Sequence, residues 1–346
     1  MSYGVVWFKR DLRLHDHAAL NQALAGGPVL CLYLIEPSLW AQADASAQHY
    51  QFIKECLREL AAELKQRGRC SQGELVLQDF LLSRCRGYRG GISSPLSAPT
   101  ACSRLSAHLA YGTLSLREVV QATHPHIARL KAQGKGQSTY AAQGLTAFLS
   151  RLHWHCHFMQ KLESEPELEW RNVHRGYDDL REPDWNPAHF EALKQGRTGW
   201  PMVGACVAML HQTGWLNFRM RAMLVSVAAY PLWLHWREVG LWLTREFLDH
   251  EPGIHWSQLQ MQSGTTGINI ARVYNPIKQA QDHDPHGAFV RRWLPALRRS
   301  DEVRAGKAAI VEKHASRKIP GTRAVGPRRG RQTGHATSAQ LSLGFD

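Results

Sequence analysis

The N-terminal part of the chain alternates between short apolar runs and helical patterns. Gly4–Phe8 and Pro28–Ile35 have the length and the Val, Leu and Tyr content of buried strands, and Ala18–Ala25 between them is typical of a helix. A strand, a helix and a strand in this order predict a parallel pair with a right-handed crossover. Ser46–Arg67 is then an amphipathic helix, because apolar residues recur at helical spacing: Phe52, Cys56, Leu60 and Leu64.

The strand signal weakens after this helix. Glu74–Leu77 supplies a third short strand at most, and a sheet of two or three strands is marginal alone because its edges and one face stay uncovered. Cys85–Pro99 contains Gly, Ser and Pro, which predict a loop or linker. We therefore expect an α/β, Rossmann-like remnant over residues 1–72 and a linker over 73–99.

From Ser103 onward the pattern is helical throughout. The most informative helix spans Thr139–Glu163, where one apolar stripe consists of Leu145, Phe148, Leu149, Leu152, Cys156 and Met159. After Arg298 the composition becomes basic, small and rich in Gly and Pro, which predicts a disordered tail. We expect a larger all-α domain over residues 100–299 and a basic tail over 300–346.

Composition narrows the class of protein. The net charge of +13 favours an anionic partner, most simply nucleic acid, although part of the excess lies in the tail. The seven cysteines are odd in number and never form C-x-x-C, which indicates a reducing compartment rather than a disulfide framework. No apolar run approaches about 18 residues, so we expect no membrane segment. A cytoplasmic monomer without a signal peptide is the expectation.

A polar constellation interrupts the apolar helices of the C-terminal half. Arg221 follows Asn217 by four residues, so both side chains lie on one side of a helix. Asp249 and Glu251 flank His250 just before Pro252 and Gly253, which end a helix. An arginine that faces two carboxylates at a helix end is typical of a polar site or of a surface ion pair. Four tryptophans are close in sequence: Trp215, Trp233, Trp236 and Trp256.

A histidine-rich stretch invites a metal hypothesis that the spacing does not support. His153, His155, Cys156 and His157 are close in sequence, but on a helix only His153 and His157 share a face. No other cluster completes a tetrahedral zinc site. We expect no metal. The chain also has no G-x-G-x-x-G fingerprint and no P-loop, so a nicotinamide enzyme is poorly supported.

Several long motifs occur in the order of a known family. They are VVWFKRDLRLHDHAAL from Val5, TACSRLSAHLAYGTLS from Thr100, GWLNFRMRAML from Gly214, FLDHEPGIHWSQLQMQSGTTGIN from Phe247 and YNPIKQAQDHDPHGAFVRRWLPAL from Tyr274. In these motifs the chain resembles the DNA photolyase/cryptochrome family, over most of its length up to about Arg299. The resemblance implies FAD bound in the helical domain. It also implies a large internal deletion from the N-terminal domain, so we expect no antenna chromophore.

The resemblance assigns a set of cofactor-binding residues. Arg221 is expected to pair with Asp249 beside the flavin ring, and Glu251 replaces a second acid of the family. Ser103 and Ser106 precede an apolar run and are typical of helix N-caps, and the resemblance makes their turn a pyrophosphate site. The full expected set is Tyr88, Ser103, Arg104, Leu105, Ser106, Phe148, His155, Arg221, Asp249, Glu251 and His255.

The resemblance also implies DNA as partner, with a damaged base flipped towards the flavin from a duplex or a single strand. The expected lesion-binding residues are Arg151, Trp154, Asn217, Arg219 and Met261. Trp154 and Arg151 lie away from the apolar stripe of their helix, which suits a flat ligand or a second packing partner. Arg151 stands where the family has a Glu that contacts the lesion, and Met261 replaces a tryptophan.

Electron transfer is the expected chemistry. Trp236 and Trp185 match the middle and outer tryptophans of the family's photoreduction path, but Leu259 stands at the innermost place. Trp256 or Trp233 is the expected substitute. His255 stands where photolyases usually have Asn, and as a histidine it is expected to change charge near neutral pH and donate a proton.

Three functions remain open from the sequence. The first is a lyase that repairs pyrimidine dimers in DNA with light and reduced FAD, which net basicity and Trp154 favour. The second is a cryptochrome-like photoreceptor or DNA-binding flavoprotein without repair, which Arg151, Met261 and Leu259 favour. The third is a degenerate, inactive family member, which the deletion favours.

The C-terminal residues resemble a second kind of motif. Gln340–Phe345 resembles the short Q-L-x-L-F peptide with which bacterial DNA-processing proteins bind the sliding clamp, with Gly344 as one extra residue. A flexible segment of this kind places a few apolar anchors in a groove. The bacterial sliding clamp is therefore an expected partner, against the alternative of an ordinary tail.

Overall fold

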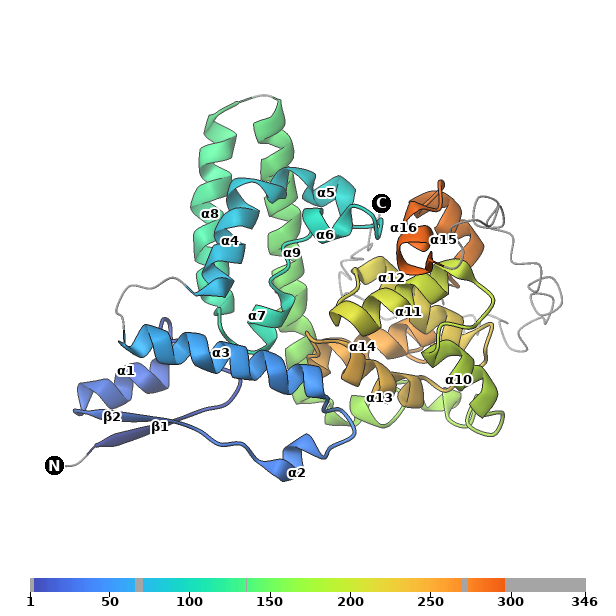
Figure 1. Ribbon diagram of the computed structural model, residues 1–346, viewed down its shortest axis with the longest axis horizontal. Coiled ribbons are helices and arrows are strands. Elements are labelled where there is room, and N and C mark those ends of the chain that lie inside the picture. Colours follow the sequence, from blue (N-terminus) through green and yellow to red (C-terminus); the bar gives the residue numbers. More distant parts are fainter. Residues whose placement is uncertain (1–2, 66–70, 135, 269–272, 296–346) are drawn as a thin grey trace, which may run out of the picture.

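The structure, a computed structural model, describes residues 3–65, 71–134, 136–268 and 273–295. A small sheet and its helices lie at one end of the molecule, a long helical hairpin rises from the middle, and a compact group of helices forms the other end (Figure 1). The predicted tail and the sliding-clamp motif lie outside the described residues.

The N-terminal unit forms as the apolar pattern predicts. Strands β1 (Gly4–Phe8) and β2 (Val29–Tyr33) pair in parallel and are joined by helix α1 (Ala18–Ala25). Helix α3 (Ala47–Lys65) buries Ile53, Cys56 and Leu60, and α2 (Pro37–Trp40) precedes it. The parallel strand–helix–strand unit is confirmed, whereas two strands do not establish a Rossmann-like domain.

The predicted third strand is wrong, because its residues are helical, and the segment that we expected to be a linker begins with a helix. Glu74–Leu77 belongs to helix α4 (Gln72–Leu82), which begins with a capping box between Ser71 and Glu74. Phe80 and Leu81 of this helix are buried with residues of the long hairpin, so the segment is part of a core. Three short helical turns follow: η1 (Arg84–Gly87), α5 (Tyr88–Gly91) and α6 (Ala98–Ala101).

Helices α8 (Leu116–Ala132) and α9 (Gln137–Ser164) form the long hairpin of Figure 1. A second capping box, Ser115 with Glu118, starts α8. The predicted stripe of α9 is buried in its first part, at Leu145, Phe148, Leu149 and Leu152. The lower part of α9 packs against α14 of the C-terminal group, so this helix joins the two halves of the molecule.

The C-terminal group of helices surrounds the largest core. Met202, Leu216, Met220, Trp236 and Trp256 are among its buried members. Its elements, with the short helix α7 that precedes α8, are as follows: α7 (Ser106–Ala110), η2 (Pro166–Glu169), η3 (Arg175–Tyr177), α10 (Pro187–Lys194), α11 (Pro201–Thr213), α12 (Phe218–Ala229), α13 (Trp236–Glu246), α14 (Pro252–Ser263), α15 (Pro276–His283) and α16 (Ala288–Trp293).

The turn after α7 attaches the N-terminal unit to the helices. Leu12 N–H donates to Tyr111 O, and Arg13 donates to Gly112 O. Gly112 has a φ of 67°, and a Cβ there would collide with the backbone of Arg10 and Asp11. This glycine therefore serves both the left-handed backbone and the close approach of the two segments.

Replacing Gly112 by Ala should destabilise the protein more than replacing Gly134, which has a φ of 88° but nothing within 4 Å of its Cβ position. Both variants share the left-handed strain of about 1–2 kcal/mol. Only Gly112→Ala adds overpacking, about 1–3 kcal/mol more. Urea unfolding of both variants is the measurement, and equal losses would contradict the close approach.

Candidate functional site

The predicted pair of Arg221 and Asp249 forms the centre of a polar site. Arg221 Nη2 lies 2.8 Å from Asp249 Oδ2, and its Nε donates to Leu216 O at 2.7 Å. The guanidinium also lies 4.1 Å from the centre of the Phe247 ring. Burial alone would raise the pKa of Asp249, but the charge and hydrogen bond of Arg221, with a hydrogen bond from Ser106, bring that pKa below its ordinary value. Asp249 is therefore an anion at neutral pH.

The segment before α7 brings one further cation, Arg104, near this carboxylate. Arg104, with a φ of 63°, lies 3.8 Å over the Trp215 ring. Burial lowers the pKa of Arg104, and the charge of Asp249 partly offsets this effect. Arg84, which the sequence did not single out, donates to the carbonyl oxygens of Cys102 and Ser103 and so fixes the segment.

The expectation that Ser103 and Ser106 cap a helix is wrong. Helix α7 has five residues, and its N-cap is Leu105, which makes no side-chain cap. Leu105 itself is buried in a hydrophobic cluster. The Ser106 hydroxyl instead donates a hydrogen bond to the Asp249 carboxylate, which lowers the pKa of that carboxyl. The local run of serines could not reveal this, because the partner is distant in sequence.

Glu251 pairs with a residue from the long helix α9. His155 Nε2 lies 2.8 Å from Glu251 Oε2. Gly253, two residues later, permits this approach, because a Cβ there would lie 2.7 Å from Phe158 O on α9. Two residues that the resemblance assigned separately to the cofactor therefore face each other across the junction of α9 and α14.

His255 also lies on α14, two residues after Gly253, and its side chain is buried. Its Nε2 lies 3.1 Å from Gly240 O. Burial lowers the pKa of His255 to about 4. The expectation that His255 changes charge near neutral pH is therefore wrong, and the ring is neutral there.

An aromatic column leads from His255 into the core. The ring centres of His255 and Trp256 are 4.9 Å apart, and those of Trp256 and Trp236 are 6.0 Å apart. Trp236 Nε1 donates to Asn172 Oδ1 at 2.7 Å. Trp185 packs on Phe190 with ring centres 5.0 Å apart. Trp256 therefore has an aromatic ring next to that of Trp236, whereas Leu259 has none.

The expected lesion-binding residues do not form one cluster of side-chain contacts. Trp154 is half-buried and stacks at an angle on Phe158, and Arg151 is exposed and donates to Ala147 O. Asn217 is buried, and its amide donates to Ile92 O and Ser93 O, so it holds backbone. Arg219 is half-buried, and Met261 Sδ accepts from Gln258 at 3.7 Å.

Two further expected cofactor residues are packed inside a core. Tyr88 and Phe148 are buried together around Phe80, with ring centres 5.5 Å apart for Tyr88 and Phe80 and 4.9 Å apart for Phe148 and Phe80. Burial raises the pKa of Tyr88. Neither side chain is offered to a ligand in this arrangement, because α5 packs directly against α9.

Some buried polar atoms on the helices near the Arg221–Asp249 pair have no hydrogen-bond partner. Four of them are His155 Nδ1, Asn217 Oδ1, Arg219 Nε and Gln258 Oε1, from α9, α14 and the start of α12. A buried polar atom without a partner costs about 1–3 kcal/mol, so a ligand rich in donors and acceptors is favoured there. The donors and acceptors of these residues therefore suit a group such as a flavin, and Gln258 is a polar residue that the sequence analysis did not single out.

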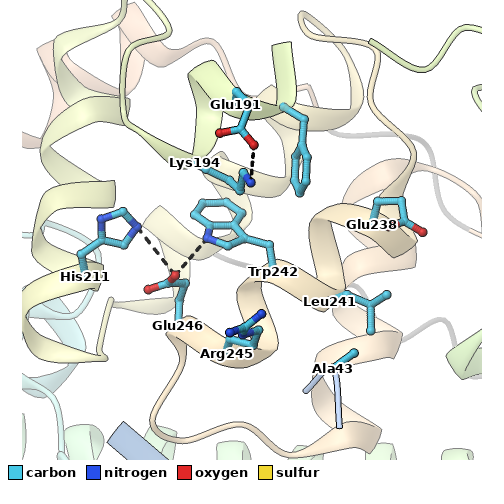
Figure 2. Close-up of a pocket in the computed structure, with 10 residues that line it drawn as sticks. Ala43, Glu191, Lys194, His211, Glu238, Leu241, Trp242, Arg245 and Glu246 are labelled. Carbon is cyan, nitrogen blue, oxygen red and sulfur yellow. Dashed lines mark hydrogen bonds and ion pairs between the residues drawn. The ribbon is translucent and has the colours of Figure 1, made fainter. Parts of the chain in front are cut away.

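A surface cavity of about 510 Å³ lies apart from this site, between α10, α11 and α13 (Figure 2). Trp242 and Glu246 line it, with a hydrogen bond of 3.0 Å between Trp242 Nε1 and Glu246 Oε1. Its other charged groups include the Lys194–Glu191 ion pair. None of the expected site residues lines this cavity.

Two absences can be stated for the described residues. They contain no group of three or more His, Cys, Asp or Glu side chains arranged to hold a metal ion. Among their helices, none is both long and apolar enough to cross a membrane.

Comparison with known proteins decides the family. The FAD binding domain of DNA photolyase matches residues 148–323, about half of the chain, and the DNA photolyase domain matches residues 4–79. The chain belongs to the DNA photolyase/cryptochrome family. A deoxyribodipyrimidine photo-lyase of Escherichia coli is 31% identical over 201 residues, which are 57% of this chain and 40% of that protein. A deoxyribodipyrimidine photo-lyase of Vibrio cholerae is 31% identical over 236 residues, which are 64% of this chain and 45% of that protein.

The matched region thus spans less than half of these two photo-lyases. Solved structures agree in fold at 18% identity. The Synechocystis sp. PCC6803 cryptochrome has a TM-score of 0.70, covering 88% of this chain and 91% of its own. A class III photolyase of Agrobacterium tumefaciens has a TM-score of 0.65, covering 86% and 88%. Both a photolyase and a cryptochrome therefore share the architecture.

His255 should contribute to acid sensitivity. Between pH 6.5 and about 4 the unfolded chain binds a proton at His255 that the folded chain excludes, so the free energy of unfolding falls as pH falls. His255→Gln keeps a donor for Gly240 O. Its free energy of unfolding should decrease less between pH 7 and 5 than that of the wild type, by about 1 kcal/mol. Urea unfolding at both pH values measures this. The exposed His124→Gln should behave as the wild type, and identical slopes for both variants would contradict the assignment.

Proposed function

We propose that this chain binds FAD between α9, α12 and α14 and uses it in light-driven repair of pyrimidine dimers in DNA. The observation that carries the proposal is the largely buried Arg221–Asp249 pair, whose carboxylate also interacts with Ser106 and Arg104. The photo-lyases of Escherichia coli and Vibrio cholerae support the reaction by similarity.

The residues have distinct tasks in this proposal. Arg221 and Asp249 hold opposite charges beside the flavin ring, and Arg104 and Ser106 complete the polar side. Glu251 accepts a hydrogen bond, with His155 fixing its position. Neutral His255 donates or accepts a hydrogen bond without carrying charge. Bound, reduced FAD supplies the light-driven electron that splits the dimer.

Trp154 and Arg219 are the DNA-facing residues of the proposal. Trp154 is partly exposed on α9 and offers an aromatic face to a flipped base, worth about 1–3 kcal/mol by stacking. Arg219 carries an unpartnered Nε, and Arg151 adds an exposed cation. The net charge of +13 strengthens association with the DNA backbone.

A cryptochrome-like photoreceptor or DNA-binding flavoprotein without repair is the second candidate. It is favoured by Arg151, which places a cation where the family has an acid at the lesion, and by Asn217, whose amide holds the backbone of Ile92 and Ser93. Such a protein keeps the flavin and the aromatic column but loses contacts to the lesion.

The functional test is illumination of a dimer-bearing oligonucleotide with the purified protein. Repair predicts loss of dimers under blue light and none in the dark, measured by chromatography of the digested DNA. Trp154→Ala should slow repair about tenfold or more, whereas replacing the exposed Trp170, which is not among the expected site residues, by Ala should not. Flavin photoreduction without dimer loss would replace repair by the photoreceptor function.

The cofactor is tested separately through Asp249. Asp249→Ala leaves Arg221 without its partner, which should cost about 3 kcal/mol of stability and most of the bound flavin. The exposed pair of Asp282 with Lys278 provides the control, because Asp282→Ala should cost less than about 0.5 kcal/mol. Flavin absorbance per protein and thermal unfolding are the measurements. Unchanged flavin content in Asp249→Ala would contradict the site.

Electron entry is tested through the aromatic column. Trp256→Phe and Trp236→Phe should each slow flavin reduction under blue light with an external reductant about tenfold or more, by removing an easily oxidised ring. Trp242→Phe, in the surface cavity, should leave the rate unchanged. A normal rate in Trp256→Phe would show that electrons bypass this ring.

A further inference from the structure

The two-stranded sheet has one covered face and one open face. Residues alternate along each strand, so Val6 and Phe8 point into the core with α1 and α3, and Val5 and Trp7 point to the opposite side. The strand register places Val5 beside Leu30 and Trp7 beside Leu32. In Figure 1, α1 and α3 lie on one side of the strands.

The side chains on the open side are apolar and exposed. Val5 is 54% exposed, Trp7 46% and Leu30 49%. The same alternation adds Tyr3 and Leu34, which are also exposed, and half-buried Leu32. We call these six residues the open sheet face: Tyr3, Val5, Trp7, Leu30, Leu32 and Leu34. Strands that are apolar on both faces are typical of parallel sheets covered on both sides.

The chemistry of this face selects its occupant. None of its six residues is charged, but Lys9, the next residue in the same alternation, places its Nζ 4.0 Å from the centre of the Trp7 ring, so one cation lies on this face. Nucleic acid is recognised by several cations and polar groups, and one cation among apolar side chains does not provide them, so DNA does not fit the open sheet face. An apolar partner fits, because both surfaces lose water on contact.

We propose that the open sheet face packs against the same face of a second copy of this chain. A two-fold axis brings one patch onto itself, so Trp7 and Val5 of one copy meet the apolar face of the other. Six such side chains offer on the order of 600 Å² per copy, and a pair buries about 1,200 Å², the lower end of stable interfaces. The dimer is therefore weak, with a dissociation constant on the order of micromolar.

The proposed dimer leaves the flavin site accessible. The strands lie at the end of the molecule remote from α12 and α14 in Figure 1. Because each copy carries a charge of +13, salt should strengthen self-association by screening repulsion, whereas salt weakens binding to DNA. This proposal differs from the monomer expected from the sequence, and it is independent of flavin binding.

Sedimentation velocity of the full chain, from sub-micromolar to high micromolar concentration, tests the proposal. The mass should rise from 39.1 kDa towards twice that value, and more readily at higher salt. Trp7→Glu and Leu30→Glu should each weaken association about 100-fold, because each buries a charge in an apolar contact. Circular dichroism verifies that the variants are folded.

Trp170→Glu is the matched control, because Trp170 is 48% exposed on a different surface. It should associate as the wild type does. A wild-type chain that stays at 39.1 kDa at every concentration would overturn the proposal. Three other results would also overturn it. They are association that persists in both Trp7→Glu and Leu30→Glu, association that is weakened to the same extent in Trp170→Glu, and association that becomes weaker at higher salt.

Discussion

The Arg221–Asp249 ion pair constrains the arrangement of the helical half. Asp249 lies in the turn between α13 and α14, and Arg221 lies on α12, so the pair connects three helices. Without its partner either charge would be left largely removed from water, which is strongly unfavourable. Arg104 and Ser106 interact with the same carboxylate, Arg104 through its charge and Ser106 through a hydrogen bond. Removal of any one of these groups therefore leaves a charge less well compensated.

The long helix α9 carries this constraint to the rest of the molecule. Its first part forms a core with α4 and α8, and its second part meets α14 through His155 and Glu251. Gly253 permits the backbones of α9 and α14 to approach. A shift of α9 would therefore move Trp154, on the proposed DNA side, together with His155, on the flavin side. In the proposed function, the positions of the base and of the cofactor therefore both depend on this helix.

The sequence could predict what depends on local pattern or on spacing within a motif. It predicted the strand–helix–strand unit, the stripe of α9 and the pairing of Arg221 with Asp249. It missed α4, although Ser71 and Glu74 carry the capping-box signature, because the Gly and Pro content nearby favoured a linker. It could not predict that Asn217 would hold Ile92 and Ser93, since those contacts join segments more than a hundred residues apart.

Burial explains why His255 departs most from its sequence-based role. A histidine near a flavin site is expected to exchange protons at neutral pH, but removal from water disfavours the charged ring and outweighs the contact with Gly240. The same burial places His255 against Trp256. A neutral ring adds no further positive charge beside Arg221 and Arg104, the two arginines whose charges interact with Asp249. Burial in the core therefore keeps His255 neutral, which leaves the net charge of the site unchanged. The same burial brings the His255 ring into contact with Trp256, so the aromatic column reaches the polar site.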